Sequence, residues 1–174
     1  MSKVSMRDVD MADAAMMASL ARRTFAETLG HLYSRANLEA FLAGHSEEAW
    51  QDDLADPRFE ARLAETGGEP IGFVAIGRPN LPFAVDEENS VELRMLYVLA
   101  PWHGKGVAPV LMQWAVERAR ERGAGALFLS VFIDNRRARA FYTRYGLAEI
   151  GPYAFKVGTH EDQDIVMRLG LEQE

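Results

Sequence analysis

The chain has 174 residues, of which 48% are hydrophobic and 26% charged, so its size and composition predict one globular domain over residues 1–174. Its formal net charge of −7 would repel a phosphate backbone, which argues against nucleic acid as a partner. The absence of cysteine excludes disulfides, thiolate-bound zinc and a covalent cysteine intermediate. The four histidines show no metal-ligand spacing, so we expect no metal.

No segment suits a membrane. The longest stretch without Asp, Glu, Lys or Arg covers residues 123–133, which is far short of the ~20 apolar residues that cross a bilayer. Charged residues precede any apolar segment at the N-terminus, unlike in a secretory signal. We therefore expect a cytoplasmic protein that starts near Met1 and has no membrane partner.

The first third of the chain predicts three helices, over residues 10–28, 34–44 and 46–57, after a polar lead over residues 2–9. Each helix begins at Asp or Ser, whose side chains can cap free N–H groups, and each is closed by Gly or Pro. Apolar residues recur between these ends at helical spacing.

Sheet structure is expected next. Residues 59–65 and 71–76 flank a glycine turn and predict an antiparallel hairpin. A loop with the acids of residues 86–88 leads to residues 90–99, a strand too apolar to have one face in water, which predicts a central strand.

The last third predicts a helix over residues 107–123 and a buried strand over residues 126–133. A strand, helix and strand in this order imply parallel pairing with a right-handed crossover. Another helix over residues 135–145 and final strands over 147–157 and 165–169 complete an α/β domain.

Residues 96–108, with the sequence LYVLAPWHGKGVA, run from the central strand through a glycine turn into a helix. Free N–H groups at a helix start bind anions, and Gly104 and Gly106 would let a phosphate approach the backbone. The pattern equally fits a tight turn that needs glycine only for its backbone angles. A Walker A loop and a dinucleotide fingerprint do not fit, because Leu99 and Pro109 stand where they require glycine.

Two motifs together resemble the GNAT superfamily of acyl-CoA-dependent N-acetyltransferases. Its Arg/Gln-x-x-Gly-x-Gly/Ala motif after an aromatic-Val-x-x-Pro strand end is similar to HGKGVA after YVLAP, with His103 in place of Arg or Gln. Its Asn-x-x-Ala and Phe-Tyr-x-x-x-Gly-Phe elements are similar to residues 135–147, NRRARAFYTRYGL. The resemblance covers residues 59–169. It implies a mixed, centrally splayed β-sheet flanked by helices, with N-terminal helices before the sheet.

The resemblance also implies acetyl-CoA as cosubstrate. Its pyrophosphate would lie on backbone N–H groups of residues 103–108, and its pantetheine would run beside residues 96–98, where two parallel strands splay apart. For Lys105 an exposed charge is an equal alternative, and for Asn135 a helix cap is. The implied cofactor residues are Leu96, Tyr97, Val98, His103, Gly104, Lys105, Gly106, Val107, Ala108 and Asn135.

By the same resemblance, two residues are catalytic. Tyr142 would protonate the departing CoA thiolate, which suits a phenol with a pKa near ~10. The alternative is that Tyr142 only packs in an aromatic helix face. Glu92 would accept the proton of the attacking ammonium, directly or through water, and the alternative is an ordinary acid at a strand end. A backbone N–H near Val98 would polarise the thioester oxygen.

The expected reaction is direct transfer of an acetyl group to a primary amine. Residues 155–167 and 24–28 more narrowly resemble bacterial spermidine/spermine N-acetyltransferases. With the net charge and the acids of residues 86–88 and 161–164, this predicts a small cationic amine, with polyamines first and a protein N-terminus or lysine second. The rival hypothesis is a catalytically silent acyl-CoA-binding module, and a homodimer is left open.

Overall fold

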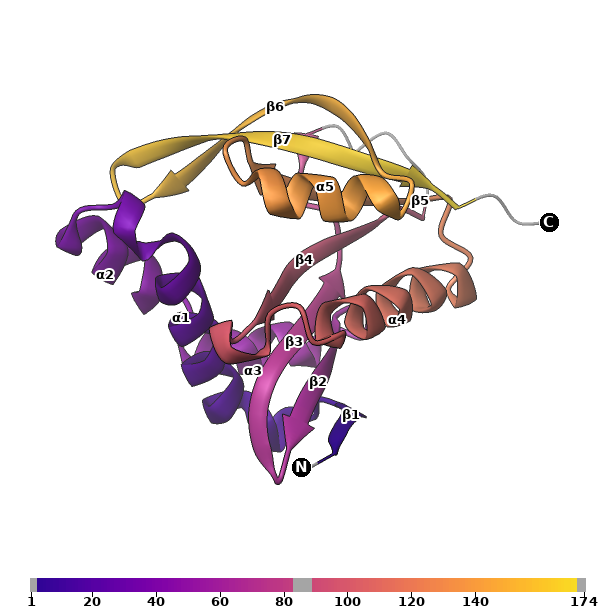
Figure 1. Cartoon of the computed structure of the whole chain (residues 1–174), viewed down its shortest axis with the longest axis horizontal. Helices are drawn as coiled ribbons and strands as arrows, with labels where there is room; N and C mark the ends of the chain where they lie inside the picture. The colour runs from indigo at the N-terminus through magenta and orange to yellow at the C-terminus, as the bar shows by residue number, and fades with distance from the viewer. Residues whose placement is uncertain (1–2, 83–88, 172–174) are drawn as a thin grey trace.

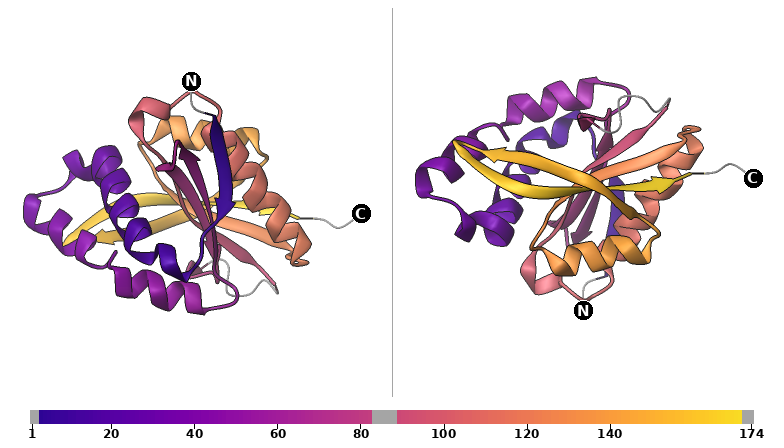
Figure 2. Two further views of the ribbon diagram at one scale, coloured as in Figure 1. Left: turned by 90° about the horizontal axis from the view of Figure 1, so that it is seen from below. Right: turned by 90° about the horizontal axis from the view of Figure 1, so that it is seen from above.

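The computed structural model describes residues 3–82 and 89–171, so the acidic run of residues 86–88 lies outside the described residues. The described chain forms a seven-stranded mixed sheet in the order β1-β2-β3-β4-β5-β7-β6. Helices α1, α2 and α3 lie on one side of this sheet, and α4 and α5 lie on the other (Figures 1 and 2). The predicted fold class is confirmed.

The first strand was not predicted. β1 (Val4–Asp8) pairs antiparallel with β2 (Glu60–Thr66) at the sheet edge, so the expected polar lead over residues 2–9 is wrong. Val4 and Met6 pack against the core, whereas Arg7, which follows Met6, forms ion pairs with Asp13 and Glu65. Alternation over so short an edge strand is hidden by its polar residues.

The three N-terminal helices are confirmed. A short 3-10 turn (Met11–Asp13) precedes α1 (Ala14–Leu29), and α2 (Arg35–Ala43) and α3 (Glu47–Ala55) follow. Their start signals act as predicted, because the side chains of Asp10, Ser34 and Ser46 each accept a backbone N–H of the following turn.

The hairpin of β2 and β3 (Glu69–Gly77) and the central strand β4 (Val91–Val98) are confirmed. Helix α4 (Val107–Glu121) connects β4 to β5 (Ala126–Phe132), which is parallel to it. The two strands pair only at Val91 with Leu127 and at Glu92 with Phe128. Beyond these pairs they diverge, which produces the expected splay.

Helix α5 (Arg136–Arg144) and the strands β6 (Ala148–Val157) and β7 (His160–Gly170) complete the chain. β7 lies between β5 and β6 and pairs antiparallel with both. It begins at His160, so the predicted start at residue 165 is wrong. Asp162 and Asp164 lie inside the strand, where their charge conceals the apolar pattern on which the prediction depended.

A bulge in β4 decides which side chains share a face. Ala75 pairs with Met95 but Ile76 pairs with Leu93, which leaves Arg94 as an extra residue on β4. After the bulge the alternation is reversed, so Glu92 and Tyr97 lie on the same face of the sheet although five positions separate them. One core cluster fills the space between the sheet and α4, and a second fills the space between the sheet and α1 and α3.

Candidate active site

The glycine turn joins the open end of β4 to α4. Gly104 and Gly106 have φ angles of +73° and +82°, in the left-handed region that favours glycine. A Cβ atom built on either glycine would meet nothing within 4 Å. The turn therefore needs these glycines for its backbone angles, and it also leaves open space beside the backbone.

The backbone donors of this turn differ in availability. The N–H groups of His103 and Lys105 donate within the turn, to Ala100 O at 3.1 Å and to Trp102 O at 3.4 Å. Four others, from Gly104, Gly106, Val107 and Ala108, have no acceptor in the described part of the chain. Four free N–H groups around the start of a helix form a suitable cradle for an anion.

The side chains of the turn are placed differently from expectation. His103 Nε2 lies 2.6 Å from the carbonyl oxygen of Val98, so the imidazole is bound to β4 rather than free to meet a phosphate. Arg137 of α5 lies beside it, with its guanidinium nitrogen 3.4 Å from His103 Nδ1. Arg137 was not predicted, and it brings to this turn the permanent charge that His103 lacks. Lys105 lies over the Trp102 ring, 5.3 Å from its centroid.

Asn135 acts as the cap of α5, because its side-chain oxygen accepts the N–H of Ala138 at 3.2 Å. This is the structural alternative considered for it, and it uses the side chain that the cofactor role would need.

Tyr142 on α5 is 8% exposed. Its ring contacts Phe141 edge to face, so it does pack in an aromatic cluster. Its hydroxyl has no hydrogen-bond partner among the described residues. Every fully buried side-chain polar atom in these residues does have a partner, so the Tyr142 hydroxyl is not fully buried and contacts solvent. Burial, with a contribution from nearby Tyr97, raises the pKa of Tyr142, so the phenol keeps its proton at neutral pH.

Glu92 is also buried, with 8% of its surface exposed, so it is not the surface acid considered as an alternative. The N–H of Asn80 donates to its carboxylate at 2.8 Å, and burial raises the pKa of Glu92. Its position at the last pair of β4 with β5 places it at the closed end of the splay. Leu96 is four residues further on, a distance of ~13 Å along the strand.

Two aspartates of β7 face the same side of the sheet as Tyr97. Asp162 is 5% exposed and Asp164 is 6% exposed, whereas Glu161 between Asp162 and His160 is exposed. The Tyr33 hydroxyl donates to Asp162, and His160 Nε2 lies 3.0 Å from its other oxygen. Burial, with the nearby charge of Asp162, raises the pKa of Asp164 to about 7 although Ser130 hydrogen-bonds to it. The predicted acidic run thus supplies two inward-facing carboxylates.

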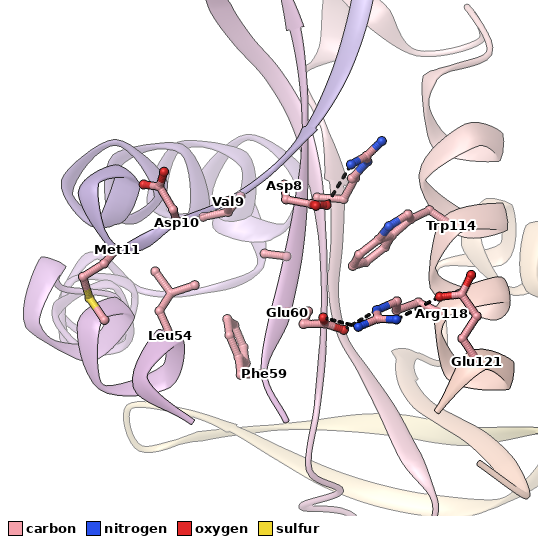
Figure 3. Close-up of a pocket in the computed structure, with 12 residues that line it drawn as sticks. Asp8, Val9, Asp10, Met11, Leu54, Phe59, Glu60, Trp114, Arg118 and Glu121 are labelled. Carbon is pink, nitrogen blue, oxygen red and sulfur yellow. Dashed lines mark hydrogen bonds and ion pairs between the residues drawn. The ribbon is translucent and has the colours of Figure 1, made fainter. Parts of the chain in front are cut away.

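A cavity of about 400 Å³ lies elsewhere, between α4, β2 and the loop after β1. Figure 3 shows Trp114 and Arg118 of α4 facing Glu60 of β2. Its charges are paired, Arg118 with Glu60 at 2.8 Å and Arg62 with Asp8 at 2.7 Å. None of the predicted site residues lines it, so it is separate from the chemistry expected at the splay.

Residues 3–82 and 89–171 contain no group of three His, Asp or Glu residues placed to hold a metal ion. None of the helices in these two segments is long and apolar enough to span a bilayer.

Residues 26–147 match the model of the acetyltransferase (GNAT) family, and the chain belongs to this family. It is an acyl-CoA-dependent N-acetyltransferase, and acetyl-CoA is its cosubstrate.

The relatives agree with this assignment. The chain is 31% identical over 158 residues to an uncharacterized N-acetyltransferase of Mycobacterium tuberculosis, covering 90% of this chain and 97% of that one. It is 36% identical over 95 residues to the aminoalkylphosphonate N-acetyltransferase of Salmonella typhimurium, covering 54% and 60%. The PaiA N-acetyltransferase of Thermoplasma acidophilum, solved with coenzyme A, shares the fold with a TM-score of 0.77 at 18% identity over 97% and 99% of the two chains.

Proposed function

We propose that this enzyme acetylates a primary amine of a small cationic acceptor, with polyamines as the first class to test. The observation that carries this proposal is the pair of buried aspartates, Asp162 and Asp164, on the face of the sheet that Tyr97 shares. Buried carboxylates are costly unless they are paired, and an ammonium group would pair with them. An anionic acceptor would be repelled.

The cofactor is proposed to enter at the open end of the splay. Its pyrophosphate would accept hydrogen bonds from the free N–H groups at Gly104, Gly106, Val107 and Ala108, with the charge of Arg137 nearby. Its pantetheine would follow residues 96–98 of β4, where no β5 residue pairs with them. The thioester would then lie near Leu96 and Tyr97.

The proposed chemistry is direct transfer, because the chain has no cysteine to carry the acetyl group. The amine nitrogen attacks the thioester carbonyl carbon, and the C–S bond breaks with its electron pair remaining on sulfur. The hydroxyl of Tyr142, which has no protein partner among the described residues, is the proposed donor of a proton to that sulfur.

Glu92 is the sequence-based choice for the group that takes the ammonium proton. From the closed end of the splay, ~13 Å along the strand from Leu96, it would do so only through water molecules. Its raised pKa suits a proton acceptor, and its hydrogen bond from Asn80 holds it in place.

A thiol-release assay tests the proposed function. The panel contains spermidine, a neutral-bodied monoamine, an aminoalkylphosphonate and a peptide with a free N-terminus and lysine. We expect spermidine to give the highest kcat/KM. Better turnover of the phosphonate or the peptide would contradict the cationic small-molecule acceptor. Acetyl-CoA binding by calorimetry, with no turnover of any amine, would identify the catalytically silent module.

A further inference from the structure

We propose that Asp164 on β7 holds the acceptor ammonium group and takes its proton before the nitrogen attacks the thioester. This inference rests on the proposed function, because it needs an amine acceptor. It assigns the role of proton acceptor to a residue of β7, a strand that lies outside the two sequence motifs of the cofactor site.

The strand register places Asp164 at the height of the thioester. Glu92 and Phe128 are the last paired residues of β4 and β5, and Leu96 and Phe132 each follow four residues later. Phe132 is the register partner of Asp164 on β7. Asp164 therefore lies opposite the part of β4 where the thioester is proposed, on the far side of the splay, whereas Glu92 lies ~13 Å lower.

The side chains around this position interact across the splay. Burial, with a contribution from the charge of Asp164, raises the pKa of Tyr97 to about 12. Tyr97 in turn contributes to the raised pKa of Tyr142, after burial. Tyr97 on β4 thus interacts electrostatically both with Asp164 on β7 and with Tyr142 on α5. Tyr142 is 8% exposed as a residue, and its hydroxyl reaches solvent without a hydrogen-bond partner among the described residues, so it is available to a ligand.

Asp162 and Asp164 differ in what they already bind. Asp162 receives the Tyr33 hydroxyl on one oxygen and His160 on the other. Asp164 has the Ser130 hydroxyl as its one partner within the described chain. Since a carboxylate offers about four acceptor positions, Asp164 keeps room for an ammonium group. Asp162 instead fixes Tyr33, whose ring stacks on Phe25 of α1.

The proton steps balance. Asp164 takes one proton from R–NH3+, and the resulting amine forms the C–N bond as the C–S bond breaks. Tyr142 gives its proton to sulfur, and its phenolate takes the second nitrogen proton from the forming amide. Asp164 then returns its proton to solvent. A carboxylate with a pKa of about 7 suits this step, because proton transfer is most effective when the pKa lies near the working pH.

Several other groups that titrate or carry charge face Asp164 and must be considered in a pH profile. They come from β4, α5, β6, β7 and the segment before α2. These are Tyr97, Tyr153, Asp162 and Tyr33, with His160 behind Asp162 and with Tyr142 on α5 interacting through Tyr97.

The test is the pH dependence of kcat/KM for the amine that the wild type acetylates best, starting with spermidine, in Asp164→Asn. We expect kcat to fall by roughly 10²–10⁴-fold at pH 7, the size of a lost general base. We expect the acidic limb of the profile to disappear, while the acetyl-CoA dissociation constant stays within twofold. Asp52→Asn is the matched control, since it makes the same substitution at an exposed carboxylate on α3, away from the proposed site. It should keep the limb and stay within twofold in kcat/KM.

Each outcome decides between assignments. An Asp164→Asn enzyme that keeps the acidic limb overturns the inference, as does a Glu92→Gln enzyme that loses it while Asp164→Asn does not. If Asp164→Asn fails to fold, Ser130→Ala replaces it. The Ser130 hydrogen bond lowers the pKa of Asp164, so its loss should raise that pKa and move the acidic limb to higher pH. An acidic limb that does not move counts against Asp164 as the base. A wild type that acetylates no amine in the panel overturns the proposed function itself, and the inference with it.

Discussion

The glycine turn offers a sharp test of cofactor placement through Gly106→Val. A side chain at the φ of +82° costs ~1–2 kcal/mol of folding free energy, because a Cβ crowds the following carbonyl in the left-handed region. For a chain of this length that cost lowers Tm by ~2–8 °C. The folded variant should still form, since nothing lies within 4 Å of the new Cβ.

The effect on acetyl-CoA should exceed the effect on stability. The valine would fill the open space beside the free N–H groups of Gly106 and Val107. A hydrogen bond to a charged group contributes ~1.5–3 kcal/mol, so losing one such contact weakens acetyl-CoA binding roughly 10- to 100-fold. Calorimetry measures this dissociation constant, and thermal unfolding measures the stability of the same sample.

Gly68→Val in the β2–β3 turn is the matched control. Gly68 has the same φ of +82° and also has nothing within 4 Å of a built Cβ. It should lose comparable stability and keep wild-type affinity for acetyl-CoA. Equal affinities in the two variants would refute the placement of the pyrophosphate at the turn.

Four further predictions concern the site. Tyr142→Phe should lower kcat roughly 10²–10⁴-fold with unchanged acetyl-CoA affinity, whereas Tyr145→Phe at the C-cap of the same helix should have little effect. Unaltered turnover of Tyr142→Phe, with chemistry rate-limiting, would return Tyr142 to a packing role. Arg137→Gln should weaken acetyl-CoA binding several-fold in calorimetry, and more at low salt than at high salt. The kcat/KM for spermidine should fall as ionic strength rises, because charge attraction is screened over ~8 Å at physiological salt. Asp164→Asn should be more stable than the wild type above pH 7. Between pH 3.8 and about 7 the folded state binds more protons than the unfolded state, because the pKa of Asp164 is raised on folding. Ionisation of Asp164 therefore lowers the free energy of unfolding as pH rises through that window, by up to roughly 4 kcal/mol. Chemical denaturation of both proteins at pH 5 and pH 8 measures the difference.

The elements that the sequence predicts well are those with local signals. Ser34 and Ser46 start their helices through hydrogen bonds to residues three positions later, so the signal and the structure lie in the same turn. The strand–helix–strand order likewise predicts the parallel pair of β4 and β5 without knowledge of distant contacts. The first cofactor motif lies in this unit and the second follows it on α5, and together they predict the family that residues 26–147 match.

The elements that were missed depend on contacts far apart in the chain. β1 is recognisable only once β2, more than fifty residues later, supplies its partner, since Val4 and Met6 alone are too few to show alternation. The bulge at Arg94 is similarly set by the register of β3 against β4. Without that bulge Glu92 and Tyr97 would lie on opposite faces, so spacing along β4 gives the wrong relation between them.

The burial of the acids of β7 likewise depends on contacts far apart in the chain. In a strand, residues 162 and 164 share a face, but a run of acids reads first as a solvated surface. Only the antiparallel pairing with β5 shows that this face is covered by the N-terminal helices and reaches Tyr97 across the splay. A carboxylate buried there destabilises the fold at neutral pH, and such a cost is typical of residues placed for chemistry. Asp164→Asn is therefore expected to gain stability and to lose activity for the same physical reason. A variant that is more stable but equally active would show that Asp164 is buried for a reason other than catalysis.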